Sequence, residues 1–313
     1  MTGKIALVGS YNVGLFLKGG RLPEPGETVI ADTFVESGGG KGSNQAVAAS
    51  MLGADVRFVG RIGSDRYGED ALAMYRRVGI DTAWIKIDDT IHSGISVILI
   101  DSEGENLISV APGANLNLSA RDIDAAETIL RESLVVGFQL ENSFETVDYG
   151  LRKVRSLGVS TFLDPAPAWK LPDDIYPSID IIKPNEMEAS ILTGVRVDGP
   201  DTAEKAGRWF LDRGVETAIV TLGGQGAVLV TEGESEHFAA PPVGAVDATG
   251  AGDIFSGGFL AALSSGESLK EAVVFALHAA SLSTEKLGVI ESIPDRTEVL
   301  AFTRRSSGPQ GVI

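Results

Sequence analysis

The feature that most constrains the fold of this 313-residue chain is a regular alternation of short apolar segments with longer amphipathic ones. The apolar segments have the length and composition of buried strands, and the segments between them have the length of helices. Strands are expected at residues 5–9, 56–59, 135–138, 160–163, 179–182 and 218–221. Strands that alternate with helices form a mainly parallel sheet with helices on both faces. The pattern therefore predicts a three-layer, doubly wound α/β fold.

Two stretches, residues 12–37 and 91–110, interrupt this alternation with strands that have no helix between them. We expect them to pair as one small antiparallel sheet beside the main body, where the sheet would act as a lid. Two unrelated surface hairpins are the alternative. The predicted organisation is one α/β domain over residues 1–304 that includes this lid, followed by a flexible tail over 305–313.

The composition excludes several kinds of partner. The net charge is −17 with only 26 Lys and Arg residues and no basic cluster, which argues against nucleic acid and against an anionic membrane surface. No apolar run approaches the roughly 18 residues of a membrane span. The absence of cysteine excludes disulfides and thiolate metal sites and fits the reducing cytoplasm, where we expect the protein to be.

A Gly-rich loop near the C-terminal end, residues 247–253, reads Asp-Ala-Thr-Gly-Ala-Gly-Asp and precedes an apolar helical run. Gly250 and Gly252 allow successive N–H groups to point toward one place at the positive end of the helix, which favours an anion. Asp253 beside them offers a base for an alcohol proton, as phosphoryl transfer to a hydroxyl requires. An Asp N-cap after a Gly-rich turn would give the same local pattern.

A second Gly-rich loop, residues 38–46, reads Gly-Gly-Gly-Lys-Gly-Ser-Asn-Gln-Ala and leads into a short helix that ends at Gly53. It is not a Walker A loop, because Gly42 follows Lys41 where Ser or Thr would be required. Its glycines let a ligand lie against the backbone, while Lys41 and Asn44 supply donors for hydroxyl or carbonyl oxygens. Taken alone, the loop is more typical of a flexible surface segment.

Together and in this order, the two loops resemble the two signature motifs of the ribokinase-like (PfkB) family of sugar kinases. The resemblance runs from about residue 4 to 302 and continues at 9–12, 25–28, 139–141, 164–168, 183–188 and 221–226, with the ribokinases as the most similar members. It implies an enzyme that transfers a phosphoryl group from ATP to a primary hydroxyl of a small sugar, ribose or ribose-like. It also implies Mg²⁺, a monovalent cation such as K⁺, and a homodimer formed through the lid.

The resemblance also assigns roles to residues of this chain. Asp253 is implied as the general base, and the amides of Gly250, Ala251 and Gly252 as the anion hole for the γ-phosphoryl group. The implied sugar-binding positions are Asn12, Gly14, Gly40, Lys41, Asn44, Glu141 and Asp253. The implied ATP-binding residues are Asn185, Glu188, Thr221, Gly223, Gly226 and Gly252. Glu188 would help to organise Mg²⁺, although a solvated helix charge is the alternative. The implied K⁺ site comprises Asp247, Thr249, Ser283, Lys286, Gly288 and Ser292, several of them through carbonyl oxygens.

One position departs from the family pattern. Ribokinases follow the Asn of the first strand end with an Asp two residues later, whereas this chain has Gly14 after Asn12. The change removes a charge-assisted hydrogen bond to a sugar hydroxyl, of order 1.5–3 kcal/mol. It is also expected to leave open space beside Gly14, so that ribose would bind weakly or be replaced by another sugar or polyol.

Other functions make different demands on the sequence. A PfkB-family kinase for a tetrose or other polyol, fructose, ketodeoxygluconate or a nucleoside would share the chemistry and differ only in the acceptor. A catalytically silent sugar-binding regulatory relative would be expected to lack the base or the anion-hole glycines, and all of them are present. A dinucleotide-dependent oxidoreductase requires G-x-G-x-x-G after the first strand, and residues 9–14 do not supply it.

Overall fold

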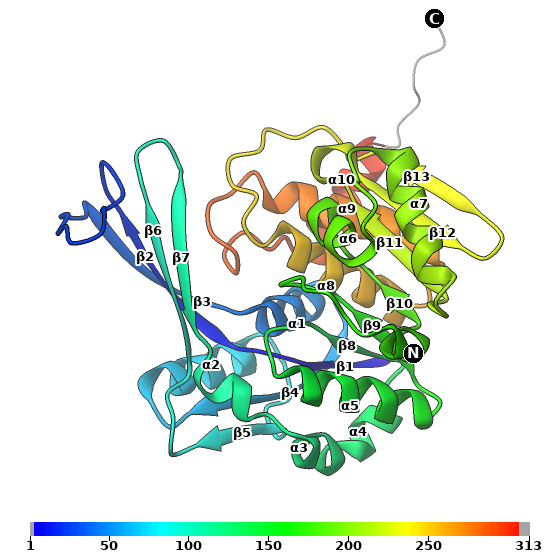
Figure 1. Ribbon diagram of the computed structural model, residues 1–313, viewed down its shortest axis with the longest axis horizontal. Coiled ribbons are helices and arrows are strands. Elements are labelled where there is room, and N and C mark those ends of the chain that lie inside the picture. Colours follow the sequence, from blue (N-terminus) through cyan, green and yellow to red (C-terminus); the bar gives the residue numbers. More distant parts are fainter. Residues whose placement is uncertain (1–2, 307–313) are drawn as a thin grey trace, which may run out of the picture.

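The computed structural model describes residues 3–306 and is built on a nine-stranded central sheet (Figure 1). The strand order across it is β13 (Ser235–Phe238), β12 (Ala227–Thr231), β11 (Thr217–Thr221), β10 (Ile181–Ile182), β9 (Ser160–Leu163), β8 (Val135–Phe138), β1 (Lys4–Val8), β4 (Asp55–Gly63) and β5 (Ile85–Asp88). The seven strands from β11 to β5 are parallel, and β12 and β13 are antiparallel additions at one edge. The predicted fold class is confirmed, and each expected strand is present, although β4 extends four residues beyond its expected end and only Ile181–Ile182 of the expected stretch 179–182 is a strand.

Helices cover both faces of this sheet, which divides the core in two. One face is covered by α1 (Lys41–Met51), α2 (Arg66–Arg77), α8 (Ala251–Ser264), α9 (Leu269–Ser283) and α10 (Arg296–Ser306). The other face is covered by α3 (Ala120–Ala125), α4 (Glu127–Arg131), α5 (Phe144–Ser156), α6 (Glu186–Thr193) and α7 (Pro200–Leu211). In β1, Ile5 and Leu7 enter the first core and Ala6 and Val8 the second. Because both faces are buried, the strand is a continuous apolar run.

The four strands of the two irregular stretches form a separate sheet, which is the lid (Figure 1). Its order is β3 (Thr33–Gly39), β2 (Asn12–Lys18), β6 (Gly94–Ile100) and β7 (Asn106–Ala111). The predicted pairing is confirmed, but the expectation of an antiparallel sheet is wrong at its centre, where β2 and β6 are parallel. The reason is topological: β2 follows β1 and β6 follows β5, so both leave the parallel central sheet in the same direction.

Three short 3₁₀ helices, η1 (Gly113–Asn117), η2 (Asp173–Ser178) and η3 (Gly223–Gln225), complete the described elements. Helix α10 continues to Ser306, so the first two residues of the predicted tail are helical, and its remainder lies outside the described residues. Within residues 3–306, no helix is both long and apolar enough to cross a membrane.

Candidate active site

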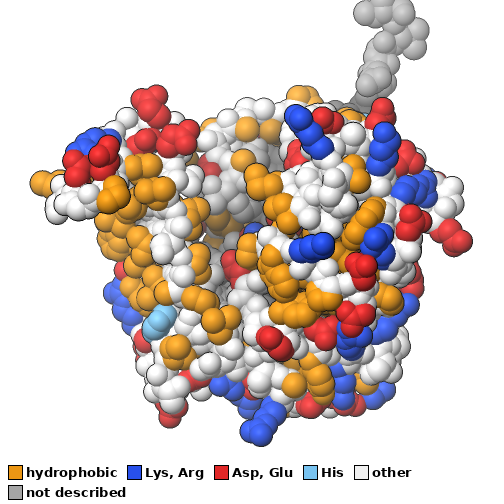
Figure 2. Space-filling model, in the orientation of Figure 1, with side chains coloured by type: hydrophobic (Ala, Val, Ile, Leu, Met, Phe, Trp, Pro, Cys, Tyr) orange, Lys and Arg blue, Asp and Glu red, His pale blue; other side chains and the backbone are white. Residues whose placement is uncertain are grey.

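The first turn of α8 separates two cavities. The first, of about 330 Å³, is lined by Gly250 and Asp253 on the body side and by the lid on the other. The second, of about 480 Å³, is lined by Ala251 and Gly252. Volumes of this size suit small ligands. Figure 2 shows the hollow between the lid and the larger body, with hydrophobic side chains gathered on the lid beside it.

All the predicted sugar-binding positions line the first cavity, which brings together residues from four distant parts of the chain. They are Asn12, Gly14, Gly40, Lys41, Asn44, Glu141 and Asp253. The sequence reasoning missed the contribution of the lid, whose inner face adds Phe16, Ser96, Ile98, Ile108 and Val110. These residues alternate along their strands with residues of the other face, which the sequence shows. Only the pairing of the strands places them together on one side of the cavity.

Glu141, in the loop after β8, connects the end of β1 with the start of α1. Its Oε2 accepts hydrogen bonds from Ser10 Oγ at 2.5 Å, from Lys41 N at 2.9 Å and from Asn12 Nδ2 at 3.2 Å. Gly40 precedes the helix with φ 89°, and a Cβ there would lie 2.7 Å from Asn12 N, so only glycine fits. The Gly-rich loop is therefore fixed in shape, and the helix begins at Lys41 within the motif.

Asp253 lies on α8 and is only 6% exposed. Asn44 Nδ2 donates to its Oδ2 at 2.8 Å, and Gln45 Nε2 donates to its Oδ1 at 3.3 Å. Both donors come from α1, which packs closely on α8: a Cβ at Gly257 would lie 2.6 Å from the Cβ of Ala48. This close approach holds both oxygens of the predicted base in a fixed orientation.

Beneath Asp253 lies a buried ion pair that the sequence reasoning did not single out. Lys183 Nζ donates to Asp164 Oδ2 at 2.8 Å and to the carbonyl of Gly252 at 3.3 Å. Gln45 Nε2 and Ser256 Oγ donate to the same Asp164 oxygen at 2.9 and 3.0 Å. The sequence did contain an indication of this pair, because Asp164 and Lys183 each come directly after a predicted strand. Lys183 thereby links the Gly250–Gly252 turn to the buried Asp164.

The charge of Lys41 is also set by this region. The negative charge of Asp253 is the main cause that raises the pKa of Lys41, and Asp164 and Glu141 add to it, while burial acts in the opposite direction. Lys41 therefore carries a positive charge throughout the neutral range. It places a cation in a cavity whose other charged residues are acidic.

The predicted anion-binding turn has the backbone form that its glycines allow. Gly250 is the N-cap of α8 with φ 76°, and a Cβ there would lie 2.4 Å from a methyl group of Val289. The N–H groups of a first helical turn have no partner within the helix. Of the three predicted donors, Ala251 N already donates a hydrogen bond to the carbonyl of Ala248 at 3.2 Å, which closes a turn.

The predicted ATP-binding residues lie around the ends of β10 and β11. Asn185 caps α6: Glu188 N donates to Asn185 Oδ1 at 2.8 Å, and Asn185 N donates to Glu188 Oε2 at 2.8 Å. Glu188 therefore has a structural role as a capping residue. Burial, followed by the charge of Asp164, raises the pKa of Glu188, although Lys183 opposes this. Thr221 forms an isolated parallel β-bridge with Asn185.

Of these ATP-site predictions, Gly223 and Gly252 line the second cavity. Gly226, with φ 99°, shapes the turn beside it. Most of the wall was missed by the sequence reasoning and is apolar, which suits a flat base. It includes Ala240, Pro241, Pro242, Val243, Phe255, Leu277 and Ala280.

Two of the residues predicted to hold a cation, Thr249 and Gly288, are joined by hydrogen bonds to Asp247. Its Oδ1 accepts from Thr249 N at 2.9 Å and its Oδ2 from Gly288 N at 3.1 Å. Burial tends to raise the pKa of Asp247, but these hydrogen bonds outweigh it and lower the pKa. The carbonyl of Ser283 accepts from Lys286 N at 3.2 Å, and Ser292 Oγ donates to the carbonyl of Val289 at 2.8 Å.

No group of three or more His, Cys, Asp or Glu residues within residues 3–306 is arranged to hold a metal ion. A cation at the Asp247 loop would therefore depend largely on carbonyl oxygens.

Asn115 in η1 orients Asn12, a role that no sequence motif indicated. Its side chain accepts from Tyr11 N at 2.9 Å and donates to the carbonyl of Tyr11 at 2.8 Å and to Asn12 Oδ1 at 2.9 Å. Because Asn12 Oδ1 is used in this way, its Nδ2 is directed to Glu141 and the cavity.

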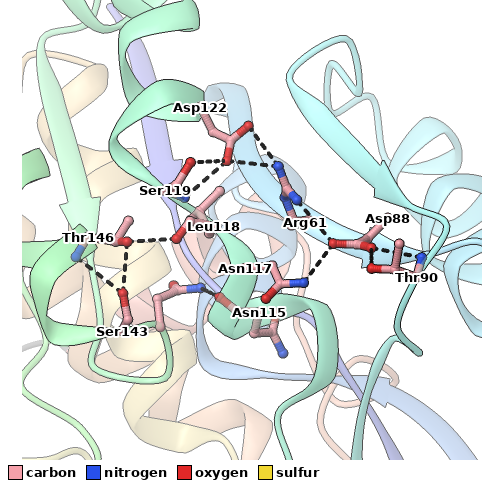
Figure 3. Close-up of polar contacts among 11 residues, drawn as sticks. Arg61, Asp88, Thr90, Asn115, Asn117, Leu118, Ser119, Asp122, Ser143 and Thr146 are labelled. Atoms are coloured by element: carbon pink, nitrogen blue, oxygen red, sulfur yellow. Dashed lines mark hydrogen bonds and ion pairs between the residues drawn. The ribbon is translucent and has the colours of Figure 1, made fainter.

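Figure 3 shows the network that holds the η1 segment in place. Arg61 bridges Asp88 at 3.0 Å and Asp122 at 3.2 Å, and Asn117 Nδ2 donates to Asp88 at 2.9 Å. Asn142 Nδ2 donates to the carbonyl of Asn115 at 2.9 Å. The orientation of Asn12 therefore depends on residues from β4, β5 and the loops around them.

The expectation of open space beside Gly14 is wrong. A Cβ at Gly14 would lie 2.5 Å from Cε2 and 3.1 Å from Cζ of the Phe16 ring. Residues 14 and 16 share one face of β2, because side chains alternate along a strand. The ring therefore fills the space that a larger residue at position 14 would occupy.

The fold and the two-cavity site define an α/β phosphotransferase for a small hydroxylated molecule. The chain belongs to the pfkB family of carbohydrate kinases, whose model matches residues 2–296. It is 39% identical over 298 residues to ribokinase of Haemophilus influenzae, covering 95% of this chain and 97% of that one. It is 36% identical over 277 residues to deoxyribokinase of Salmonella typhimurium, covering 87% and 90%.

Among solved structures, the chain superimposes on Arabidopsis thaliana ribokinase complexed with ribose and ATP with a TM-score of 0.89. The two are 32% identical, and the match covers 97% of this chain and 99% of that one. The chain is therefore a carbohydrate kinase, as the two Gly-rich motifs predicted.

Proposed function

We propose that this enzyme transfers the γ-phosphoryl group of ATP to the primary hydroxyl of ribose or a ribose-like pentose. The observation that carries the proposal is the position of Asp253 and the Gly250 turn between the two cavities. A sugar in the first cavity and a nucleotide in the second would meet at this turn. The similarity to the Haemophilus influenzae ribokinase and to the Arabidopsis enzyme complexed with ribose and ATP supports the choice of substrates.

The proposed chemistry is a displacement in which the protein mainly positions the reactants. The hydroxyl oxygen forms the new bond to the γ-phosphorus, its proton goes to Asp253, and the bond between that phosphorus and the ADP oxygen breaks. Lys41 and the amides at the start of α8 balance the charge on the transferred group. Asn12, Asn44 and Glu141 would hold the other sugar oxygens. The lid excludes water, which would otherwise compete as the acceptor.

The residues next to the nucleotide cavity fit a Mg²⁺ ion held through water. Asp164 is 1% exposed and its Oδ1 is a buried oxygen without a hydrogen-bond partner among the described residues, so a cation or its water would supply the partner that this oxygen lacks. Glu188 lies close enough for the charge of Asp164 to act on it. Oxygen ligands of this kind suit Mg²⁺, which keeps several waters and would neutralise phosphate charge.

The direct test is ADP release with a panel of pentoses, followed by ³¹P NMR to locate the phosphate on the product. We expect activity with ribose or a close analogue and phosphate on the primary hydroxyl. Activity confined to tetroses, fructose, ketodeoxygluconate or nucleosides would contradict the acceptor, and phosphate on a secondary hydroxyl would contradict the geometry.

We further expect activation by K⁺ through the loop around Asp247. Asp247 holds Thr249 and Gly288 together beside the Gly250 turn, so a cation bound to neighbouring carbonyls would stabilise the shape of the anion hole. Turnover should rise when K⁺ replaces a large organic cation at constant ionic strength. Equal rates in the two salts, after trace K⁺ has been removed, would show that no such site acts.

The outer face of the lid supports a homodimer. Phe34, Leu17, Leu99 and Leu107 form one row across all four strands, and Phe34 and Leu107 are 57% and 51% exposed. Exposed apolar rows of this kind mark association surfaces. We expect a dimer by light scattering and a monomer for the variant Phe34→Glu/Leu107→Glu. A variant that remains dimeric at the same concentration would rule out this face.

The cytoplasm remains the predicted location, because the chain has no cysteine that an oxidising compartment would convert to disulfides. Because the net charge is −17, we still expect no binding to nucleic acid or to anionic membranes.

A further inference from the structure

We infer that Phe16 makes this kinase select a pentose that lacks one ring hydroxyl, such as a deoxyribose, over ribose itself. The inference rests on the proposed function and concerns the lid side of the same cavity. It follows from the distribution of polar and apolar groups around the sugar position.

The inner face of β2 changes character along its length. Asn12, Gly14 and Phe16 point to the same side, and all three line the sugar cavity. Asn12 is the only one with a hydrogen-bonding side chain. The Phe16 ring folds back over Gly14, so neither a polar side chain nor open space lies there.

Neighbouring strands extend this apolar patch. Phe16 is paired with Ile98 of β6, and Ile98 is paired with Ile108 of β7, so the three side chains form one row on the cavity wall. The row beside Gly14 carries two serines. Ser37 Oγ already donates to the carbonyl of Gly38 at 3.2 Å. Ser96 leaves one neutral hydroxyl on this part of the wall.

The charged groups lie on the opposite side of the cavity. Lys41, Glu141 and Asp253 all belong to the α/β body, and Asn12 and Asn44 lie with them. A pentose that presents its primary hydroxyl to Asp253 finds charged partners for its other oxygens only toward that side, because the polar lid side chains that line the cavity, Ser37, Ser96 and Asn106, are neutral. A hydroxyl directed at the Phe16 row would lose its water and gain no charged partner.

The expected discrimination is moderate. An apolar wall rejects a ligand with one added hydroxyl by at most about 10²-fold, because the ligand can still retain some water. We expect catalytic efficiency to be about tenfold higher for the preferred deoxypentose, which corresponds to about 1.4 kcal/mol.

The first experiment compares kcat/KM for ribose, 2-deoxyribose and 3-deoxyribose in the unmodified enzyme. At least one deoxypentose should exceed ribose about tenfold. Ribose that equals or exceeds both deoxypentoses would overturn the inference, with Ser96 or water then serving the additional hydroxyl. No ADP release with any pentose, from folded protein that binds ATP, would instead overturn the proposed function.

The second experiment assigns the preference to Phe16. Phe16→Ala should bring the deoxypentose-to-ribose ratio close to one, because water can then reach the wall. Val35→Ala is the control: Val35 extends the same row on β3 and is 55% exposed, but it is not among the residues that line the cavity. An unchanged ratio in Phe16→Ala, at a melting temperature close to that of the control, would also overturn the inference.

A third comparison inverts the preference. In Gly14→Asp/Phe16→Ala, the carboxylate occupies the volume of the ring and can accept from the additional hydroxyl, so ribose should become the better acceptor. Gly14→Asp alone forces its Cβ against the ring and should not improve ribose. A single Gly14→Asp variant that improves ribose as much as the double variant would show that the ring is not the obstacle.

Discussion

Replacing Asp253 with Asn is expected to lower kcat by at least about 10²-fold, in line with the contribution of a general base. The amide retains the shape of the carboxylate but cannot take the proton of the sugar hydroxyl. ATP affinity should stay within a few-fold, because the second cavity is lined by other residues. Steady-state kinetics and calorimetric ATP titration measure the two quantities.

The matched control for this variant is Asp201→Asn, an exposed carboxylate in the first turn of α7 that lines neither cavity. It should retain the parent kcat. An Asp253→Asn enzyme that keeps more than about a tenth of the parent turnover would exclude Asp253 as the base, since general-base catalysis contributes more than that.

Gly250→Ala should produce the second large effect, a fall in kcat of about 10²- to 10³-fold, as for the loss of an oxyanion-hole donor. The added Cβ would lie 2.4 Å from a methyl group of Val289 at a residue with φ 76°. The turn must therefore shift, which moves the first N–H groups of α8 away from the phosphoryl position. Single-turnover kinetics at saturating sugar and ATP report this step directly.

Gly266→Ala provides a control at the other end of α8. Gly266 also has a positive φ, of 88°, but a Cβ there meets nothing within 4 Å. Both variants should lose about 1–2 kcal/mol of stability from the left-handed backbone, and only Gly250→Ala should lose turnover. Equal kinetic losses in the two variants would mean that the effect comes from general destabilisation.

Much of the architecture was predictable because its causes are local. The apolar run of β1 follows from burial on both faces, and it can be recognised within five residues. The two Gly-rich motifs are also local, since Gly40 and Gly250 adopt positive φ angles at the N-caps of α1 and α8. These features were sufficient to predict the fold class and the family.

The parts that could not be predicted depend on contacts between distant segments. Gln45 and Asp253 are 208 positions apart, and Asn115 and Tyr11 are 104 apart, so no periodicity or motif relates them. The parallel pairing of β2 with β6 follows from where each strand leaves the central sheet. None of these contacts has a signature in the residues themselves.

Position 14 shows the difference most clearly. The sequence determined that no carboxylate is present there, because a glycine has no side chain. Whether that glycine leaves a hole or supports an apolar wall was decided by the rotamer of Phe16 and by the packing of the lid strands around it. The sequence by itself thus determined the fold, the family and the chemical groups available. The tertiary structure decided which groups meet, because packing selects among conformations that local preferences leave nearly equal in energy.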